Sequence, residues 1–200
     1  VGIKSADEKI FPSIIFHSWV GGDRDGHTKV TALITKQAIE ANKRNAIEAI
    51  RNKLKTAIKN ISISAYCYPF DQNTLVSLSS IVMKSGKLQV ISKRNQGEIF
   101  RKSLTAIDYM LEAIIDPENG ARPYLSCEEF RKDLDLIDKV LSMAAKEISN
   151  QYIRPIQALH SSCGFRTMSL DIRQNSDVTT DAISNIWAFL GFEKIKYGTT

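Results

Sequence analysis

Apolar residues recur at steps of three and four along most of the chain, which is the spacing of one face of an α-helix. The pattern is clearest in three stretches, whose apolar positions are Ile47, Ile50, Leu54, Ile58 and Ile61; Phe100, Leu104, Ile107, Leu111 and Ile114; and Phe130, Leu134, Ile137, Leu141 and Ile148. These stripes predict a mainly α protein, a helical bundle segment.

Capping residues and helix breakers mark the ends of the predicted helices. Thr28 or Thr31 begins the first helix, Asp71 caps the second, and Ser126 with Glu129 forms a capping box. Helices are expected at about 28–60 (weaker at 42–45, where it can bend), 71–86, 98–115, 126–148, 153–160 and 176–190. Residues 85–94 are predicted to be a basic loop. The last helix is expected to turn four side chains inward, those of Ile183, Ile186, Trp187 and Leu190.

Two short segments, one near each end of the chain, carry strand patterns. Residues 10–20 are predicted to form a buried strand that opens after Pro12. Residues 165–172 alternate apolar and polar side chains, the period-two pattern of a strand, and Gly164 precedes them. The expected fold class is therefore mainly α with two short strands.

Residues 16–28 form the most unusual stretch, because glycines, acids, an arginine and two histidines follow the apolar run 14–16. A tight polar loop between a strand and a helix is where α/β-type proteins usually place ligands. The glycines let the backbone turn sharply. Asp23, Arg24 and Asp25 can also pair with one another through charge-assisted hydrogen bonds. The loop is a candidate ligand site, with a self-paired turn as the structural alternative.

The sequence does not match the known motifs for phosphate binding, calcium binding or nucleophilic catalysis, and it gives only a weak metal signal. The glycine spacing matches a P-loop, but His27 replaces the lysine that reaches the phosphates, and two nearby acids would repel them. An EF-hand fails because Ala32 stands where a bidentate glutamate is required. His17 and His27 have no thiolate or further histidine nearby, so they give a weak metal signal. Ser18 and Cys163 lack the motif of a nucleophile elbow.

A second candidate, Arg173, lies directly after the second predicted strand. The carboxyl end of a strand is where barrel-like proteins bind anionic substrates. A guanidinium suits a phosphate or carboxylate because it is planar, permanently charged and binds in a bidentate way. The alternative is an ion pair of Arg173 with Asp171 or Asp177.

Composition narrows the function classes. The net charge of +5 is mild and is not by itself a nucleic-acid signature. No apolar run approaches the ~20 residues that span a bilayer, and the first residues are too polar for a signal peptide. Cys67, Cys127 and Cys163 form no CxxC pair, so a reduced, cytoplasmic protein is expected. The missing initiator Met suggests a piece of a longer chain.

Basic residues are concentrated in the first predicted helix. Against Glu40 and Glu48, the stretch 29–60 holds Lys29, Lys36, Lys43, Arg44, Arg51, Lys53, Lys55 and Lys59. Such a run is usually a solvated helix face. The functional alternative is a non-catalytic helical module that binds an acidic partner through basic helix 29–60.

The two candidate sites together resemble one enzyme family. Residues 16–26, FHSWVGGDRDG, closely resemble the F-x-S-W-M-G-G-D-R-D-G-N-P segment of phosphoenolpyruvate carboxylases, and residues 170–176, LDIRQNS, resemble that family's L-D-I-R-Q-E-S. Residues 97–101, GEIFR, are similar to the family's E-P-Y-R helix start, and residues 30–35 to its V-T-x-x-V/I-T. The departures are His17, Val20 and the pair His27-Thr28, where the family has a small residue, Met and Asn-Pro.

This resemblance implies that residues 1–200 are one incomplete segment of a much longer, mostly helical enzyme around an eight-stranded barrel, to which the two strands would belong. Family enzymes join bicarbonate to phosphoenolpyruvate with Mg²⁺ or Mn²⁺, give oxaloacetate and phosphate, and are usually homotetramers. Their histidine segment lies upstream and their metal-binding acids lie downstream. The segment is therefore expected to hold no metal ligand and to be inactive alone.

The resemblance also implies which residues belong to the site. Arg173 matches the family arginine that helps to bind the substrate phosphate. Six loop residues match a segment at or near the same barrel mouth: Gly21, Gly22, Asp23, Arg24, Asp25 and Gly26. The expected partners are phosphoenolpyruvate and bicarbonate, with no nucleic acid and no membrane.

Overall fold

The computed structural model describes residues 15–25, 29–64, 66, 68–94 and 96–192. They fall into two compact units. The larger contains Lys43–Thr167, and the smaller contains Phe16–Asn42 and the described residues from Met168 onward. Helix α1 (Ala32–Asn60) runs through the boundary between them. The larger unit holds the hydrophobic core, and the smaller holds both strands.

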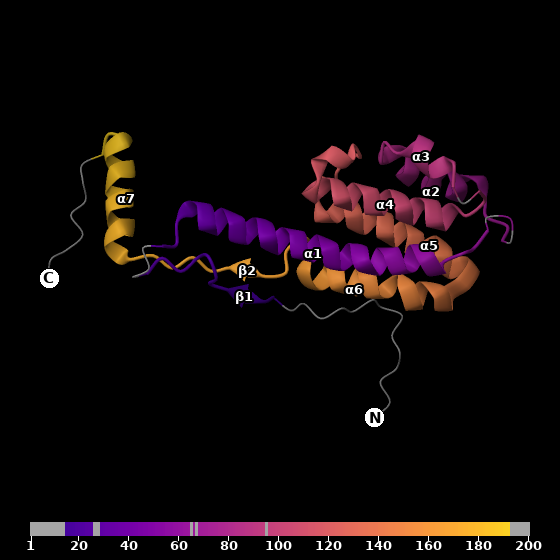
Figure 1. Ribbon diagram of the computed structural model, residues 1–200, viewed down its shortest axis with the longest axis horizontal. Helices are drawn as coiled ribbons and strands as arrows, with labels where there is room; N and C mark the ends of the chain where they lie inside the picture. Colours follow the sequence, from indigo (N-terminus) through magenta and orange to yellow (C-terminus); the bar gives the residue numbers. More distant parts are fainter. Residues whose placement is uncertain (1–14, 26–28, 65, 67, 95, 193–200) are drawn as a thin grey trace, which may run out of the picture. The chain divides into compact units, whose positions relative to one another are not determined.

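The larger unit is a helical bundle, in which α4 packs beside α2 and α5 (Figure 1). After α1 come α2 (Gln72–Lys84), α3 (Leu88–Ser92), α4 (Ile99–Ile115), the 3₁₀ turn η1 (Pro117–Asn119), α5 (Cys127–Tyr152) and α6 (Arg154–Cys163). All three predicted apolar stripes lie in the core or pack against it, which confirms them. Burial of each large apolar side chain contributes about 1.5–3 kcal/mol, so the stripes hold this bundle together.

Three predicted helix caps are present. The side chains of Thr31, Asp71 and Ser126 each accept a hydrogen bond from the backbone N–H three residues later, at 3.4, 2.9 and 3.1 Å. Thr31 therefore caps α1, while Thr28 lies outside the described residues. Helix α1 is continuous through residues 42–45, so the weaker pattern there does not interrupt the helix. The helical dihedral angles break instead at Ala145 in α5.

The predicted loop at residues 85–94 is wrong, because Leu88–Ser92 form helix α3. The many basic residues of this segment suggested a loop, but its apolar residue Ile91 is buried in the core. Burial of that side chain fixes the short helix against the bundle, although the local sequence gives no helical period.

The smaller unit contains a two-stranded parallel sheet. β1 (His17–Ser18) pairs with β2 (Ser169–Leu170), with His17 opposite Ser169, and an isolated parallel bridge joins Asp23 to Arg173. The strands predicted at 10–20 and 165–172 are thus much shorter in the described residues, because a turn after β1 interrupts the ladder. The expectation that the first strand is buried is wrong, since His17 is exposed and Ser18 is only partly buried. Residues 10–14 lie outside the described part of the chain.

Helix α7 (Ser176–Phe189) ends the described smaller unit. Its cap is Asn175, whose side chain accepts the Asp177 N–H, one residue before the predicted start of the helix at 176. The prediction that its apolar residues face inward is wrong, because no side chain of α7 is buried; Ile186, for example, is 59% exposed. The apolar pattern exists, but no described element of this unit covers it.

In the described chain, no helix has the length and apolar character needed to cross a membrane.

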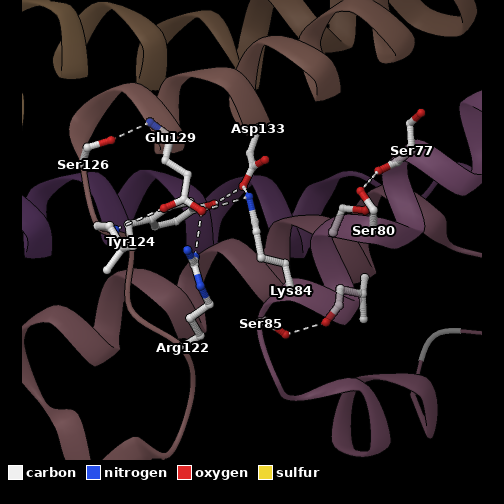
Figure 2. A network of polar contacts seen from close by, with 12 residues as sticks. Ser77, Ser80, Lys84, Ser85, Arg122, Tyr124, Ser126, Glu129 and Asp133 are labelled. Atoms are coloured by element: carbon white, nitrogen blue, oxygen red, sulfur yellow. Dashed lines mark hydrogen bonds and ion pairs between the residues drawn. The ribbon is translucent and has the colours of Figure 1, made fainter.

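A polar network ties α2 to α5 in the larger unit. Figure 2 shows the Lys84 ammonium and the Tyr124 hydroxyl converging on Asp133, with the Tyr124 oxygen 2.8 Å from the carboxylate. Glu129, one turn earlier on α5, accepts a 2.7 Å hydrogen bond from Arg122. Burial raises the pKa of Tyr124 well above its usual range, and the neighbouring Asp133 adds to the shift. The network keeps a buried phenol neutral and hydrogen-bonded.

A buried histidine on α6 adds a titrating group to the same core. His160 packs edge-on against Phe130, with ring centroids 4.8 Å apart. Burial lowers the pKa of His160, and the positive charge of Arg131 acts in the same direction, while Asp135 and Glu128 oppose it. The folded protein therefore favours the neutral imidazole.

We predict that Asp133→Ala lowers the free energy of unfolding by about 1–3 kcal/mol, because it leaves the buried Tyr124 hydroxyl without its acceptor and removes the nearer of two carboxylates from the partly buried Lys84 ammonium. Urea unfolding followed by far-ultraviolet circular dichroism measures the change. Glu147→Ala, which removes an exposed carboxylate from the same helix, should change the stability little. Equal effects of the two substitutions would contradict the role of the network.

We also predict that His160 makes the protein less stable in acid. The unfolded state binds its proton near pH 6.5, whereas the folded state resists protonation to lower pH. The stability contributed by the neutral imidazole is therefore present above about pH 6.5 and is lost as the pH falls below it. His160→Phe should reduce the loss of stability between about pH 7 and pH 5 in urea titrations. An unchanged loss in the variant would refute this assignment.

Candidate functional site

A tight turn directly after β1 shapes the glycine loop. The Trp19 carbonyl accepts hydrogen bonds from the N–H groups of Gly22 (2.8 Å) and Asp23 (3.0 Å). Gly21, the third residue of the turn, has φ +80°, a conformation that glycine adopts without steric cost. A Cβ at this position would also lie 2.6 Å from the Cβ of Ala38 on α1. Two local constraints therefore favour glycine at position 21: the positive φ of the turn and the close packing against α1.

The turn returns the chain to the second motif, where pairing resumes. The Arg173 N–H donates to the Gly22 carbonyl, and the Arg24 N–H donates to the Arg173 carbonyl, each at 2.9 Å. A Cβ on Gly22 would lie only 2.3 Å from the Asp171 carbonyl oxygen. Backbone hydrogen bonds thus bring together the two motifs that the sequence singled out, and only glycine permits this approach.

The Arg24 side chain fastens the loop to the start of α1. Its guanidinium donates to the Thr35 hydroxyl (2.8 Å), and that hydroxyl donates to the Gly21 carbonyl (2.7 Å). Thr35 is buried, and so is the Arg24 Nε, which has no hydrogen-bond partner in the described chain. The expected pairing of Arg24 with the two loop acids is therefore wrong, because the arginine binds α1 instead; within the three residues, the Asp25 N–H donates to the Asp23 carboxylate at 3.3 Å.

The two loop carboxylates face the other arginine. Arg173 nitrogen atoms lie 3.6 Å from an Asp23 oxygen and 3.9 Å from an Asp25 oxygen, and the guanidinium carbon lies 5.8 Å from the centre of the Trp19 ring. These distances hold the charge in place without direct hydrogen bonds. The Arg173 side chain is 52% exposed, and it donates no hydrogen bond to any described residue. Its donors are therefore available to an anion.

The ion-pair alternatives for Arg173 are wrong in detail. Asp171 accepts from His17 instead, with its carboxylate 2.9 Å from the imidazole Nδ1. Asp177 lies in the first turn of α7, where its N–H bonds the Asn175 side chain. The carboxylates that do approach Arg173 come from the loop after β1, on the other side of the backbone pairing.

Sequence reasoning missed two supporting residues, Thr35 and Trp19. A signal for Thr35 existed, because it completes the V-T-x-x-V/I-T pattern one helical turn after Thr31. Nothing local in the sequence indicates that Trp19 lies under Arg173. Gly26, the last loop candidate, lies outside the described residues.

The described residues do not form a metal site. No group of three or more His, Cys, Asp or Glu side chains in that part of the chain could hold a metal ion. Asp23 and Asp25 face a guanidinium, and His17 is occupied by Asp171. A carboxylate pair that already faces a cation does not fit the needs of Mg²⁺ or Mn²⁺.

The basic helix is less uniform than its sequence suggests. Arg51 is buried and paired with Asp108 and Glu112, so it belongs to the bundle and not to the surface. Lys36 and Arg44 lie near Glu40 and Glu48 one turn later. A solvated face accounts for part of α1, and binding of an acidic partner stays a prediction.

Comparison with known proteins gives the family. The family model described as phosphoenolpyruvate carboxylase matches residues 3–199. The chain belongs to the phosphoenolpyruvate carboxylase family. Its resemblance to that family, first seen in the glycine loop and around Arg173, therefore extends over nearly all of its length.

Three relatives, each named phosphoenolpyruvate carboxylase, show how much of a family protein this chain represents. The protein of Methylorubrum extorquens is 30% identical over 181 residues, which cover 88% of this chain and 20% of the relative. That of Caulobacter vibrioides is 26% identical, with 94% and 22% covered, and that of Roseiflexus castenholzii is 27% identical, with 92% and 21% covered. The chain spans about one fifth of the length of these relatives.

We predict that Gly22→Ala separates the two motifs, because its methyl group would occupy the place of the Asp171 carbonyl. Hydrogen–deuterium exchange at the Arg24 and Arg173 amides, which donate across the pairing, should become faster. Asp181→Ala is the control, since Asp181 is an exposed residue of helix α7 that lies outside the pairing. Unchanged exchange in Gly22→Ala would contradict the importance of the close approach.

Proposed function

We propose that this chain is part of a phosphoenolpyruvate carboxylase, which joins bicarbonate to phosphoenolpyruvate and releases oxaloacetate and phosphate. The observation that carries the proposal is the Arg173 guanidinium, which is held in place by its neighbours yet keeps its hydrogen-bond donors open to solvent. It lies at the end of a parallel strand pair, the place where barrel enzymes bind anionic substrates.

Arg173 has the chemistry for the phosphate group of the substrate. Its planar fork gives two parallel N–H donors to two phosphate oxygens, and these charge-assisted bonds are about twice as strong as neutral ones. The Trp19 ring near the guanidinium adds a cation–π contact that limits its motion. A phosphate can reach this arginine without first breaking a direct hydrogen bond to Asp23 or Asp25.

The charge of the described site explains why a longer protein is needed. Arg24 and Arg173 are balanced by Asp23 and Asp25, so the loop and its partner offer no net positive charge to a phosphate dianion. Carboxylates close to the bound phosphate would repel it. The remaining positive charge has to come from other parts of the enzyme, where the ligands of Mg²⁺ or Mn²⁺ are expected. We therefore expect the 200-residue chain alone to be inactive.

Exposed apolar side chains in the smaller unit support the same view. Parallel strands are normally covered on both faces, yet Phe16 and Trp19 beside β1, and Ile172 beside β2, are each about 60% exposed. The apolar residues of α7 are also uncovered. We propose that the rest of a barrel covers these surfaces in the longer protein. A bicarbonate site, a homotetramer and a cytoplasmic location are further parts of this proposal.

We predict that Arg173→Ala, made in the longer enzyme that contains this segment, lowers kcat/KM for phosphoenolpyruvate by about 10²-fold or more, because two charge-assisted hydrogen bonds to phosphate are lost. Coupled assays of oxaloacetate formation measure it. Arg173→Lys should recover only part of the loss, since an ammonium keeps the charge but not the fork.

Arg166→Ala is the matched control. It removes another exposed arginine, which lies before β2 and outside the loop pairing, and should leave the kinetics close to wild type. Wild-type kinetics in Arg173→Ala would overturn the proposed role.

A further inference from the structure

Asp171 lies two residues before Arg173, and both side chains leave the same face of the paired backbone. Their N–H groups donate to carbonyls of the same neighbouring segment, at Ser18 (2.8 Å) and Gly22 (2.9 Å). Every second residue thus bonds that segment, which is the alternation of an extended chain, and side chains two residues apart then share a face. Asp171 is therefore the neighbour of Arg173 on this face.

Side-chain contacts agree with this arrangement. His17 is paired with Ser169 in the register of β1 and β2, and its imidazole reaches the Asp171 carboxylate. Trp19, two residues after His17, places its ring near the Arg173 guanidinium. One surface of the smaller unit therefore carries the imidazole, the carboxylate, the indole and the guanidinium side by side.

The spacing permits an ion pair between Asp171 and Arg173. Residues two apart in an extended chain lie about 6.5–7 Å apart, a separation that a long side chain can cover. The Asp171 and Arg173 side chains are 55% and 52% exposed, so neither is fixed by burial. Their opposite charges attract each other. The described chain nevertheless contains no ion pair between them, which requires an explanation.

His17 provides the explanation, because it occupies the Asp171 carboxylate. The imidazole Nδ1 lies 2.9 Å from a carboxylate oxygen. A neutral imidazole with its proton on Nδ1 and an imidazolium both donate from this nitrogen, so the contact forms in either charge state. Arg24 cannot replace His17 as a partner of Asp171, since its guanidinium donates to Thr35 on α1. Without His17, Arg173 is the cation on the same face that Asp171 can approach.

A third carboxylate at Arg173 would weaken its binding of an anion. Asp23 and Asp25 lie 3.6 and 3.9 Å from its nitrogen atoms and leave its donors unused. A direct pair with Asp171 would occupy the same parallel N–H donors that a phosphate needs. It would also place one more negative charge beside that phosphate.

We propose that His17 is a positioning residue, which holds Asp171 and thereby keeps the donors of Arg173 open to an anion. The inference rests on the proposed function, because it takes Arg173 as the group that binds the substrate phosphate. His17 is one of the positions at which this chain departs from the family pattern. Its role therefore follows from the contacts of this chain and not from that pattern.

Kinetics of the longer enzyme test the proposal. His17→Ala should raise the KM for phosphoenolpyruvate about two- to fivefold, the range of an exposed ion pair that the substrate must first break. kcat should change little, since Asp171 is displaced equally in the bound state and in the transition state. His17→Ala/Asp171→Asn should recover most of the loss, because asparagine carries no charge. Removal of a second side chain would not rescue a merely structural role.

Ser169→Ala is the matched control. It removes an exposed side chain that is paired with His17 in the register, and it frees no carboxylate. The KM of this variant should stay close to wild type. A wild-type KM in His17→Ala, or a loss that Asp171→Asn does not recover, would overturn the inference.

Nuclear magnetic resonance of the 200-residue chain separates this inference from the proposed function. In His17→Ala the Arg173 Nε–H signal should shift and its hydrogen exchange should slow, as the direct pair with Asp171 forms, and both should return in His17→Ala/Asp171→Asn. An unchanged Arg173 signal overturns the inference and leaves the carboxylase proposal intact. A longer enzyme that forms no oxaloacetate overturns the carboxylase proposal, and the Arg173 signal then still decides the role of His17.

Discussion

The backbone hydrogen bonds that join Gly22 and Arg24 to Arg173 are the interaction on which the candidate site depends. They bring together residues 150 positions apart, at 23 and 173, and they form only because Gly22 has no Cβ to meet the Asp171 carbonyl. The turn at Gly21 restores the register after β1 and places Asp23 opposite Arg173. The close backbone approach fixes where the side chains lie, and it thereby sets the distances at which the charges of Arg173, Asp23 and Asp25 interact.

The two arginines of the site have different tasks because their surroundings differ. Arg24 is tied through the buried Thr35 to the first turns of α1, which suits a structural anchor. Arg173 lies half exposed near two carboxylates and above an indole ring, which suits a ligand-binding group. The balance of two cations and two anions around the loop is consistent with our proposal that other parts of a longer enzyme complete the site. The exposed apolar residues of the smaller unit support the same proposal, because further parts of a longer enzyme would cover them.

The helices of the larger unit follow from local sequence, because apolar periodicity and caps such as Asp71 and Ser126 act within a few residues. The exceptions depend on tertiary context. Burial of Ile91 produces α3 without a helical period, and α7 has an apolar face that no described residue covers. For the site, the two motifs and their pairing into one family pattern were visible in the sequence. The contacts of these motifs could not be predicted, because they join residues that are distant in the sequence. Arg24 binds Thr35, and Arg173 lies near Asp23 and Asp25.

The central claim is that Arg173, presented by this backbone pairing, binds the substrate phosphate in the longer enzyme. A crystal structure of that enzyme with bound phosphoenolpyruvate tests it most directly. The account predicts both terminal guanidinium nitrogens of Arg173 at about 2.7–2.9 Å from phosphate oxygens, with the Gly22 and Arg24 backbone bonds intact. A phosphate bound elsewhere, with Arg173 still facing only Asp23 and Asp25, would contradict it.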